Sequence, residues 1–101
     1  MFNDEEVFGR RIFVGGLDRL EDPLALEQIL REAFEPCGRI VDVHVVRDFE
    51  TSMGRGFAFV TFADEMSAQA VISQYDGNEI DGRRVGVSLA RPIERKNRRE
   101  S

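Results

Sequence analysis

Apolar residues recur along this chain with two different periods, and the shorter period predicts strands. Residues 54–62, GRGFAFVTF, alternate strictly, so this stretch predicts a strand with two chemically different faces. One face carries Phe57, Phe59 and Thr61, and the other carries Ala58, Val60 and Phe62. Residues 10–17, RRIFVGGL, predict an earlier strand that ends at paired glycines, and residues 39–48, RIVDVHVVRD, predict another. A last strand is expected over residues 84–90.

The longer period predicts two helices. Asp22 followed by Pro23 is typical of a helix cap and first helical position. After it, apolar residues return at three- and four-residue intervals, which places one apolar stripe on a helix. These are Leu26, Ile29, Leu30, Ala33 and Phe34. Asp64 is suited to cap a second helix, whose apolar positions are Ala68, Val71, Ile72 and Tyr75, and Gly77 is suited to end it.

The order of these elements predicts the fold class. Only residues 49–54 join the second and third strands, and so short a connection implies antiparallel neighbours. The order β-α-β-β-α-β predicts an α+β, ferredoxin-like sandwich, a four-stranded antiparallel sheet with two helices on one face. Alternation directs Ile12, Val14, Ala58, Val60 and Phe62 toward the helices. It leaves Phe13, Phe57 and Phe59 on the open face, where flat rings are suited to stack on nucleobases.

Composition and charge narrow the function classes. A chain of 101 residues predicts one domain, and we expect a monomer. The net charge is −5, yet residues 1–9 hold three acids without a base, and 13 of the 14 basic residues are arginines, which bind phosphates well. One cysteine, Cys37, and one histidine provide neither an internal disulfide nor a zinc ligand set. No apolar run is long enough to cross a membrane, so we expect a soluble intracellular protein without metal, cofactor or membrane partner.

Two motifs resemble those of a known family. Residues 55–62, RGFAFVTF, match every position of the octamer of the RNA recognition motif. Residues 12–17, IFVGGL, resemble the family's hexamer, and NEIDGRRVGV resembles its usual approach to the fourth strand. The similarity covers residues 10–92, which leaves an acidic segment at 1–9 and a basic tail at 93–101. The combination resembles heterogeneous nuclear ribonucleoproteins and glycine-rich RNA-binding proteins.

The resemblance implies roles for individual residues. Phe13 and Phe59 would stack on adjacent bases, Phe57 would pack against riboses, and Arg55 would contact a phosphate. Further contacts are expected from the neighbouring strands and the end of the last one. These are Asp42, His44, Val46, Ser88, Ala90 and Arg91. Phe49 is expected either to add a ring or to anchor its loop.

The resulting prediction is a module for single-stranded RNA, in mRNA processing or regulation, in the nucleus or shuttling from it. Single-stranded DNA is an alternative ligand, and a protein partner on the sheet or the acidic first helix is an alternative function. Acylphosphatases share a similar topology, but residues 15–23, GGLDRLEDP, place acids where a phosphate cradle would be needed. We therefore expect no enzymatic activity.

Overall fold

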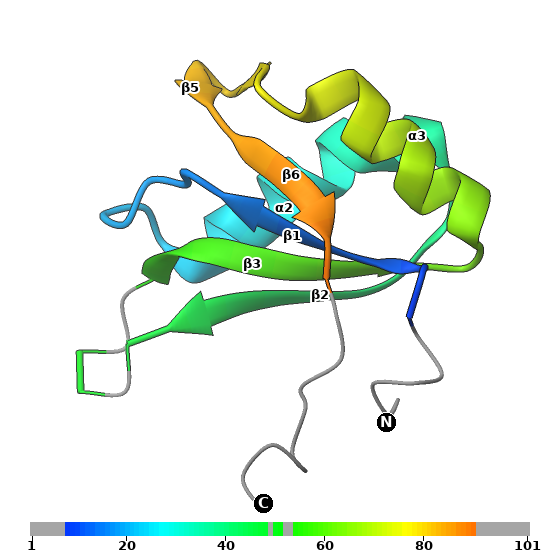
Figure 1. Cartoon of the computed structure of the whole chain (residues 1–101). Coiled ribbons are helices and arrows are strands. Elements are labelled where there is room, and N and C mark those ends of the chain that lie inside the picture. The colour runs from blue at the N-terminus through cyan, green and yellow to red at the C-terminus, as the bar shows by residue number, and fades with distance from the viewer. Residues whose placement is uncertain (1–7, 49, 52–53, 91–101) are drawn as a thin grey trace, which may run out of the picture.

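The computed structural model describes residues 8–48, 50–51 and 54–90. Two helices and a 3-10 turn are interspersed among the strands along the chain (Figure 1). They are β1 (Arg11–Gly15), α2 (Pro23–Phe34), the 3-10 turn η1 (Glu35–Cys37), β2 (Ile40–Arg47), β3 (Gly54–Phe62), α3 (Glu65–Tyr75), β4 (Glu79–Ile80), β5 (Arg83–Arg84) and β6 (Gly86–Leu89). The predicted ferredoxin-like α+β fold is confirmed. No helix in the described ranges is long and apolar enough to cross a membrane.

Both helices begin where the sequence places their caps. The Asp22 carboxylate accepts hydrogen bonds from the backbone N–H groups of Leu24 and Ala25, at 3.1 and 3.2 Å. The Asp64 carboxylate accepts one from the Ser67 N–H at 2.8 Å. Each bond satisfies an amide that the helix itself leaves without a partner, so the two starts are fixed locally.

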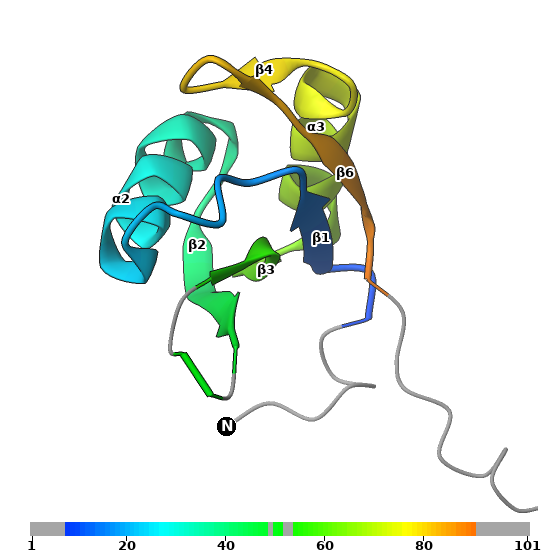
Figure 2. The same cartoon turned by 90° about the vertical axis from the view of Figure 1, so that its left-hand side faces the viewer.

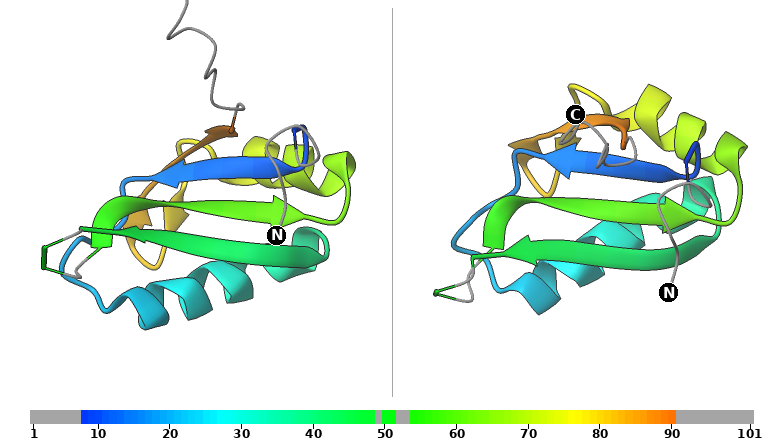
Figure 3. Two further views of the ribbon diagram at one scale, coloured as in Figure 1. Left: turned by 90° about the horizontal axis from the view of Figure 1, so that it is seen from below. Right: turned by 60° about the horizontal axis from the view of Figure 1, so that its bottom comes forward.

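The four-stranded sheet has the order β2-β3-β1-β6, with every neighbouring pair antiparallel. α2 packs mainly on β2, and α3 mainly on β6, so both helices cover the same face (Figures 1 and 2). Seen from below, the strands lie in front and the helices behind them or past their edges (Figure 3). Within the described part of the chain, no helix covers this second face of the sheet.

The core lies between the sheet and the two helices. Ile12 and Val14 of β1 face it, as do alternate residues of β3, and all of these side chains have no solvent exposure. The β3 members are Ala58, Val60 and Phe62. The ring of Phe34 lies 6.4 Å from that of Phe62 and 5.2 Å from that of Tyr75, which joins both helices to the sheet. The predicted inward-facing set is therefore confirmed.

The last strand is shorter than predicted. β6 covers Gly86–Leu89, whereas Arg84 belongs to the small hairpin of β4 and β5, opposite Glu79. Val85 is buried between the two, and its N–H donates to the Asn78 carbonyl at 2.8 Å. This local bond competes with pairing to β1, so residues 84 and 85 do not extend the main sheet.

Candidate nucleic-acid interface

Cross-strand pairing arranges the side chains of the uncovered face in rows. Phe13 lies directly opposite Phe59 on one side and Ser88 on the other, and Phe59 lies opposite His44. A row of His44, Phe59, Phe13 and Ser88 therefore crosses all four strands, because directly opposed residues share a face. His44 and Ser88 are exposed at its two ends. The row places two aromatic rings at the centre of the open face.

Three aromatic rings form one cluster there. The ring centroids of Phe13 and Phe57 lie 5.4 Å apart, those of Phe13 and Phe59 lie 5.7 Å apart, and those of Phe57 and Phe59 lie 6.3 Å apart. The first pair is tilted, and the other two are edge-to-face, an arrangement that aromatic pairs favour. Each ring is half-buried by its neighbours. The cluster is thus preformed while part of each ring stays accessible.

Gly15 shapes this cluster because it has no side chain. A Cβ atom at Gly15 would lie 3.0 Å from Cε2 and 3.2 Å from Cζ of Phe13. The Phe13 ring therefore leans along β1 over Gly15, toward Phe57, which is paired with Gly15 across the strands. A larger residue at this position would have to displace the ring.

A polar row lies beside the aromatic one. Arg11 is paired with Thr61, and Thr61 is paired with Asp42. Arg11 Nε donates a hydrogen bond of 3.1 Å to the Thr61 hydroxyl, and Thr61 has no solvent exposure. Asp42 and Arg11 are half-buried. Asp42 was predicted as a site residue from the sequence, whereas Arg11 and Thr61 were not. Alternation along residues 11–15 could have placed Arg11 on the face of Phe13.

Arg55 lies at the start of β3 with an exposed side chain. The nearby Asp48 organises the β2–β3 loop, since its Oδ1 accepts from the N–H groups of Glu50 at 2.8 Å and Thr51 at 3.1 Å. These backbone bonds, chiefly the one from Glu50, lower the pKa of Asp48, and the charge of Arg55 lowers it further. A cation close to the loop is therefore available to an anionic ligand.

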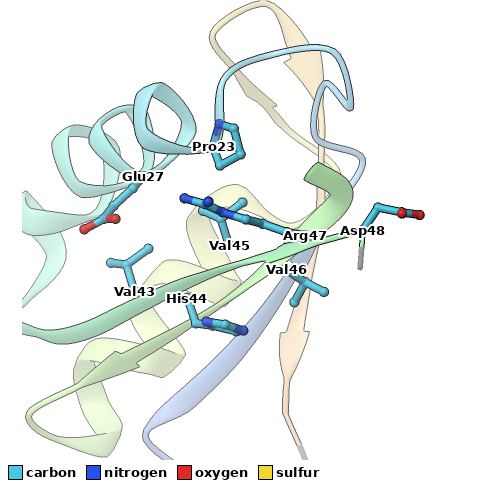
Figure 4. Close-up of a pocket in the computed structure, with 8 residues that line it drawn as sticks. All are labelled: Pro23, Glu27, Val43, His44, Val45, Val46, Arg47 and Asp48. Carbon is cyan, nitrogen blue, oxygen red and sulfur yellow. The ribbon is translucent and has the colours of Figure 1, made fainter. Parts of the chain in front are cut away.

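A groove runs along the outer edge of β2, on the side of α2 (Figure 4). Pro23 and Glu27 line it from α2, and Val43 and Val45 line it from β2. The figure shows the side chains of His44 and Val46 pointing to the opposite side of the strand. His44 and Val46 therefore point to the open face, as predicted. Because both also line the groove, the groove reaches the edge of that face at β2.

The model of the RNA recognition motif matches residues 12–86, which is most of the chain. The chain belongs to the RNA recognition motif family. Its predicted hexamer and octamer thus lie on β1 and β3, the two central strands of the sheet.

Relatives within this family agree with the assignment. The chain is 40% identical over 90 residues to glycine-rich RNA-binding protein 2, mitochondrial, of Arabidopsis thaliana, covering 89% of this chain and 54% of that protein. It therefore spans about half the length of that relative. A solved Sxl-lethal protein/RNA complex matches with a TM-score of 0.72 and 28% identity over 83% of this chain and 49% of that one. The second such domain of yeast poly(U)-binding protein matches with a TM-score of 0.70 and 29% identity, over 84% and 98% of the two chains.

The structure brings most of the predicted site residues of this RNA recognition motif onto one face. Phe13, Phe57 and Phe59 form the centre. Around them lie Asp42, His44, Val46 and Ser88, with Ala90 beyond the end of β6. Phe49 and Arg91 lie outside the described residues, as do residues 1–7 of the acidic segment at 1–9 and the basic tail at 93–101. In the described part of the chain, no cluster of His, Cys, Asp or Glu could hold a metal ion.

Proposed function

We propose that this domain is an RNA-binding module that takes short single-stranded RNA on the uncovered face of its sheet. The observation that carries the proposal is the preformed cluster of Phe13, Phe57 and Phe59. Single-stranded bases are commonly bound by stacking on aromatic side chains. Membership of the RNA recognition motif family, and relatives named as RNA-binding proteins, support the same function.

In this proposal Phe59 and Phe13 stack on two successive bases, Phe57 packs against the sugars, and Arg55 neutralises a phosphate. The rings are fixed by one another before RNA arrives, so little side-chain entropy is lost on binding. Each stacked base contributes about 1–3 kcal/mol. His44, Val46 and Ser88 flank the rings on β2 and β6 and add contacts to neighbouring nucleotides, as Asp42 does one row away. A stretch of two to four nucleotides is the expected footprint.

Overall charge limits the affinity. The chain has a net charge of −5, and residues 18–36 alone hold six acids against two arginines. Release of counterions from RNA supplies much of the binding free energy of basic proteins, and little of it is available here. Stacking should therefore dominate, with modest affinity. The basic tail at 93–101 is proposed to add positive charge.

The wider role is proposed from the same residues. We propose action in mRNA processing or regulation, as a monomer, with single-stranded DNA as a weaker ligand of the same rings. We also propose a nuclear or nucleocytoplasmic location. Imaging of the tagged protein in cells would distinguish this location from an organellar one, which is the alternative because one relative is named mitochondrial. We propose no catalysis, because Asp18 and Glu21 lie in the loop after β1, where a phosphate cradle would need cations.

The proposal is tested by an NMR titration of the protein with a pool of short single-stranded RNAs at low salt. Wild type is compared with the Phe57→Ala/Phe59→Ala double variant. Met66→Ala is the matched control, because Met66 is 81% exposed on α3, in the other layer of the fold. We expect amide shifts on Phe13 and Val46 and at residues 55–59, retained in the control and lost in the double variant.

Three other results would each refute the proposal. A folded wild-type protein whose sheet does not respond to RNA would show that the rings are not a binding platform. Shifts confined to α2, where Leu24 is 67% exposed, would place the RNA contact outside the sheet. Equal binding by wild type and double variant would remove the stacking mechanism.

A further inference from the structure

β2 is an end strand of the sheet, and one row of its backbone groups points away from β3. The register fixes which residues carry them. The Phe62 N–H donates to the Arg10 carbonyl at 2.8 Å, so the backbone groups of Phe62 point toward β1. This direction alternates from residue to residue along an antiparallel strand, and Phe59 lies three positions before Phe62. The backbone groups of Phe59 therefore point toward β2.

His44 is the β2 residue paired with Phe59, so its N–H and carbonyl groups face β3. The same groups of its neighbours, Val43 and Val45, therefore point outward. β2 contains no lysine or proline, which commonly protect exposed sheet edges. Register shifts lie toward both ends of β2 and leave a regular stretch at residues 42–45, and in the described part of the chain no strand lies beyond it. These outward groups are available to a further strand.

α2 makes a groove of this edge. Figure 3 shows α2 past the outer edge of β2, so a strand added beside β2 would have the helix behind it. The groove has a volume of about 540 Å³, within the range of pockets that hold ligands. Val43, Val45 and Pro23 give it an apolar lining, and Val45 and Pro23 are buried. In Figure 4 the side chains of Glu27 and Val43 point toward one another across it.

The charge around the groove favours a basic partner. Arg31 Nε donates to Glu27 Oε2 at 3.1 Å, which holds this carboxylate on the α2 side, and Asp48 lines the groove at the end of β2. Arg47 is a basic residue of the lining, but residues 18–36 hold six acids against two arginines. Phosphate groups would be repelled by this surface, whereas lysine and arginine side chains would be attracted.

A second copy of the chain does not fit the same edge. Its own α2 would project past its β2 on the same side of the sheet. The two helices would meet before the strands reached their pairing distance of about 4.8 Å. An extended segment without such a helix meets no obstacle.

We propose that an extended segment of a partner protein binds along β2 as an added antiparallel strand. Its backbone bonds to the outward N–H and carbonyl groups of Val43 and Val45, as in other cases of strand addition. Its groove-facing residues are apolar, and the alternate residues are lysine or arginine. The antiparallel direction follows the rest of the sheet and is the more stable one per residue. The inference is independent of RNA binding, since it uses backbone groups at the sheet edge rather than the rings.

The experiment is an NMR titration of the labelled protein with a synthetic peptide of alternating valine and lysine whose ends are blocked. In the antiparallel arrangement the valines face the groove, and their N–H groups point toward β2. Two further peptides carry N-methyl groups, either on all valines or on all lysines. The valine-methylated peptide loses its bonds to the carbonyls of Val43 and Val45 and should bind about thirtyfold more weakly. The lysine-methylated peptide should bind like the unmodified one.

Amide hydrogen exchange locates the added strand. The N–H groups of Val43 and Val45 should exchange quickly with solvent in the free protein, because they point outward, and slowly once the peptide is bound. The His44 N–H faces β3 and should exchange slowly in both states. Fast exchange at Val43 and Val45 that the bound peptide does not change would place the peptide elsewhere and overturn the proposal.

Variants assign the binding to this groove. Val43→Pro removes an outward N–H but no bond between β2 and β3, and should weaken the peptide about fivefold. Glu27→Lys should weaken the binding of the lysine peptide and strengthen that of a matching peptide of valine and glutamate. Glu32→Lys is the matched control, because it makes the same charge change on α2 at a residue that does not line the groove. Circular dichroism measures whether each variant is folded.

Other outcomes would also overturn the proposal. Equal affinity for the unmodified and both methylated peptides would exclude backbone pairing, and equal affinity for the lysine and glutamate peptides would exclude a basic partner. A doubled molecular mass of the free protein in sedimentation, lost in Val43→Pro, would assign the edge to a second copy instead. Absence of peptide binding by the folded wild-type protein would refute the proposal and leave RNA binding on the rings untouched.

Discussion

Phe59 and Phe62 provide a sharp comparison, because they lie three residues apart on β3 and face opposite sides of the sheet. Phe62 has no solvent exposure and contacts Phe34 in the core, with ring centroids 6.4 Å apart. Phe59 is half-buried and contacts Phe13 and Phe57 on the open face, with centroids 5.7 and 6.3 Å away. Truncation of each ring to alanine should therefore have different consequences.

The magnitudes follow from these contacts. Phe62→Ala opens a cavity in the core and should cost about 3–5 kcal/mol of the free energy of unfolding. Phe59→Ala loses two aromatic pairs at about 0.5–1.5 kcal/mol each, or about 1–3 kcal/mol in total. The loss of RNA affinity should be larger for Phe59→Ala than for Phe62→Ala, which is the reverse of the order for stability. Phe59→Ala removes one stacking surface, about 1–3 kcal/mol of binding free energy, whereas the folded fraction of Phe62→Ala keeps its affinity.

Urea denaturation followed by circular dichroism measures the stability of both variants, and fluorescence anisotropy with a labelled short single-stranded RNA measures their affinity. A domain of this size has about 5–15 kcal/mol of stability, so both variants should fold in the absence of urea at low temperature. The placement of the two faces would be wrong if Phe59→Ala were the less stable variant. It would also be wrong if Phe62→Ala, while folded, lost more affinity than Phe59→Ala.

Three further predictions concern charge and backbone. Arg55→Ala should reduce the slope of log affinity against log salt by about one, measured by anisotropy at several salt concentrations; an unchanged slope contradicts a phosphate contact. Gly38→Ala should lower the free energy of unfolding by about 1–3 kcal/mol in urea denaturation, because its Cβ would overlap the buried Ser67 side chain. Gly86→Ala is the control and should be nearly neutral, since the nearest atom to its added Cβ lies 4.0 Å away. Equal losses of stability in the two variants would contradict this steric explanation. A hydrogen bond from the Ser67 backbone N–H lowers the pKa of Asp64 from its ordinary value of 3.8. The ionised Asp64 therefore stabilises the fold fully above that ordinary pKa, and this contribution is lost as the pH falls through the lower pKa of the folded state. Asp64→Asn should flatten this acid decline in thermal melts at pH 2–5, and an identical decline in both proteins would exclude the contribution.

Much of the fold could be predicted because its signals are local. A cap such as Asp22 acts on amides two and three residues away, so the start of α2 is encoded within a few positions. The alternation on β3 likewise assigned Phe59 and Phe62 to opposite faces without knowledge of the partner strands. The family motifs extended these signals to function, since they lie on the two central strands.

Other features of the site depend on contacts between distant segments. The opposition of Phe13 to Phe59 and Ser88 follows from pairing between strands that lie far apart in sequence. Arg11 was missed because its importance comes from Thr61, which is 50 residues away. The start of β6 was predicted too early because the Val85 N–H bonds back to the Asn78 carbonyl.

By itself, the sequence determined which residues could stack on bases, where the helices begin, and which side of each strand is apolar. These depend on backbone hydrogen bonds and periodicities that operate over a few residues. The tertiary structure decided which side chains became neighbours. It closed three phenylalanine rings into one cluster, buried Thr61 and placed Arg11 beside the rings. Such placements require the register of four strands at once, and that register is fixed only when both helices bury one face of the sheet and leave the other uncovered.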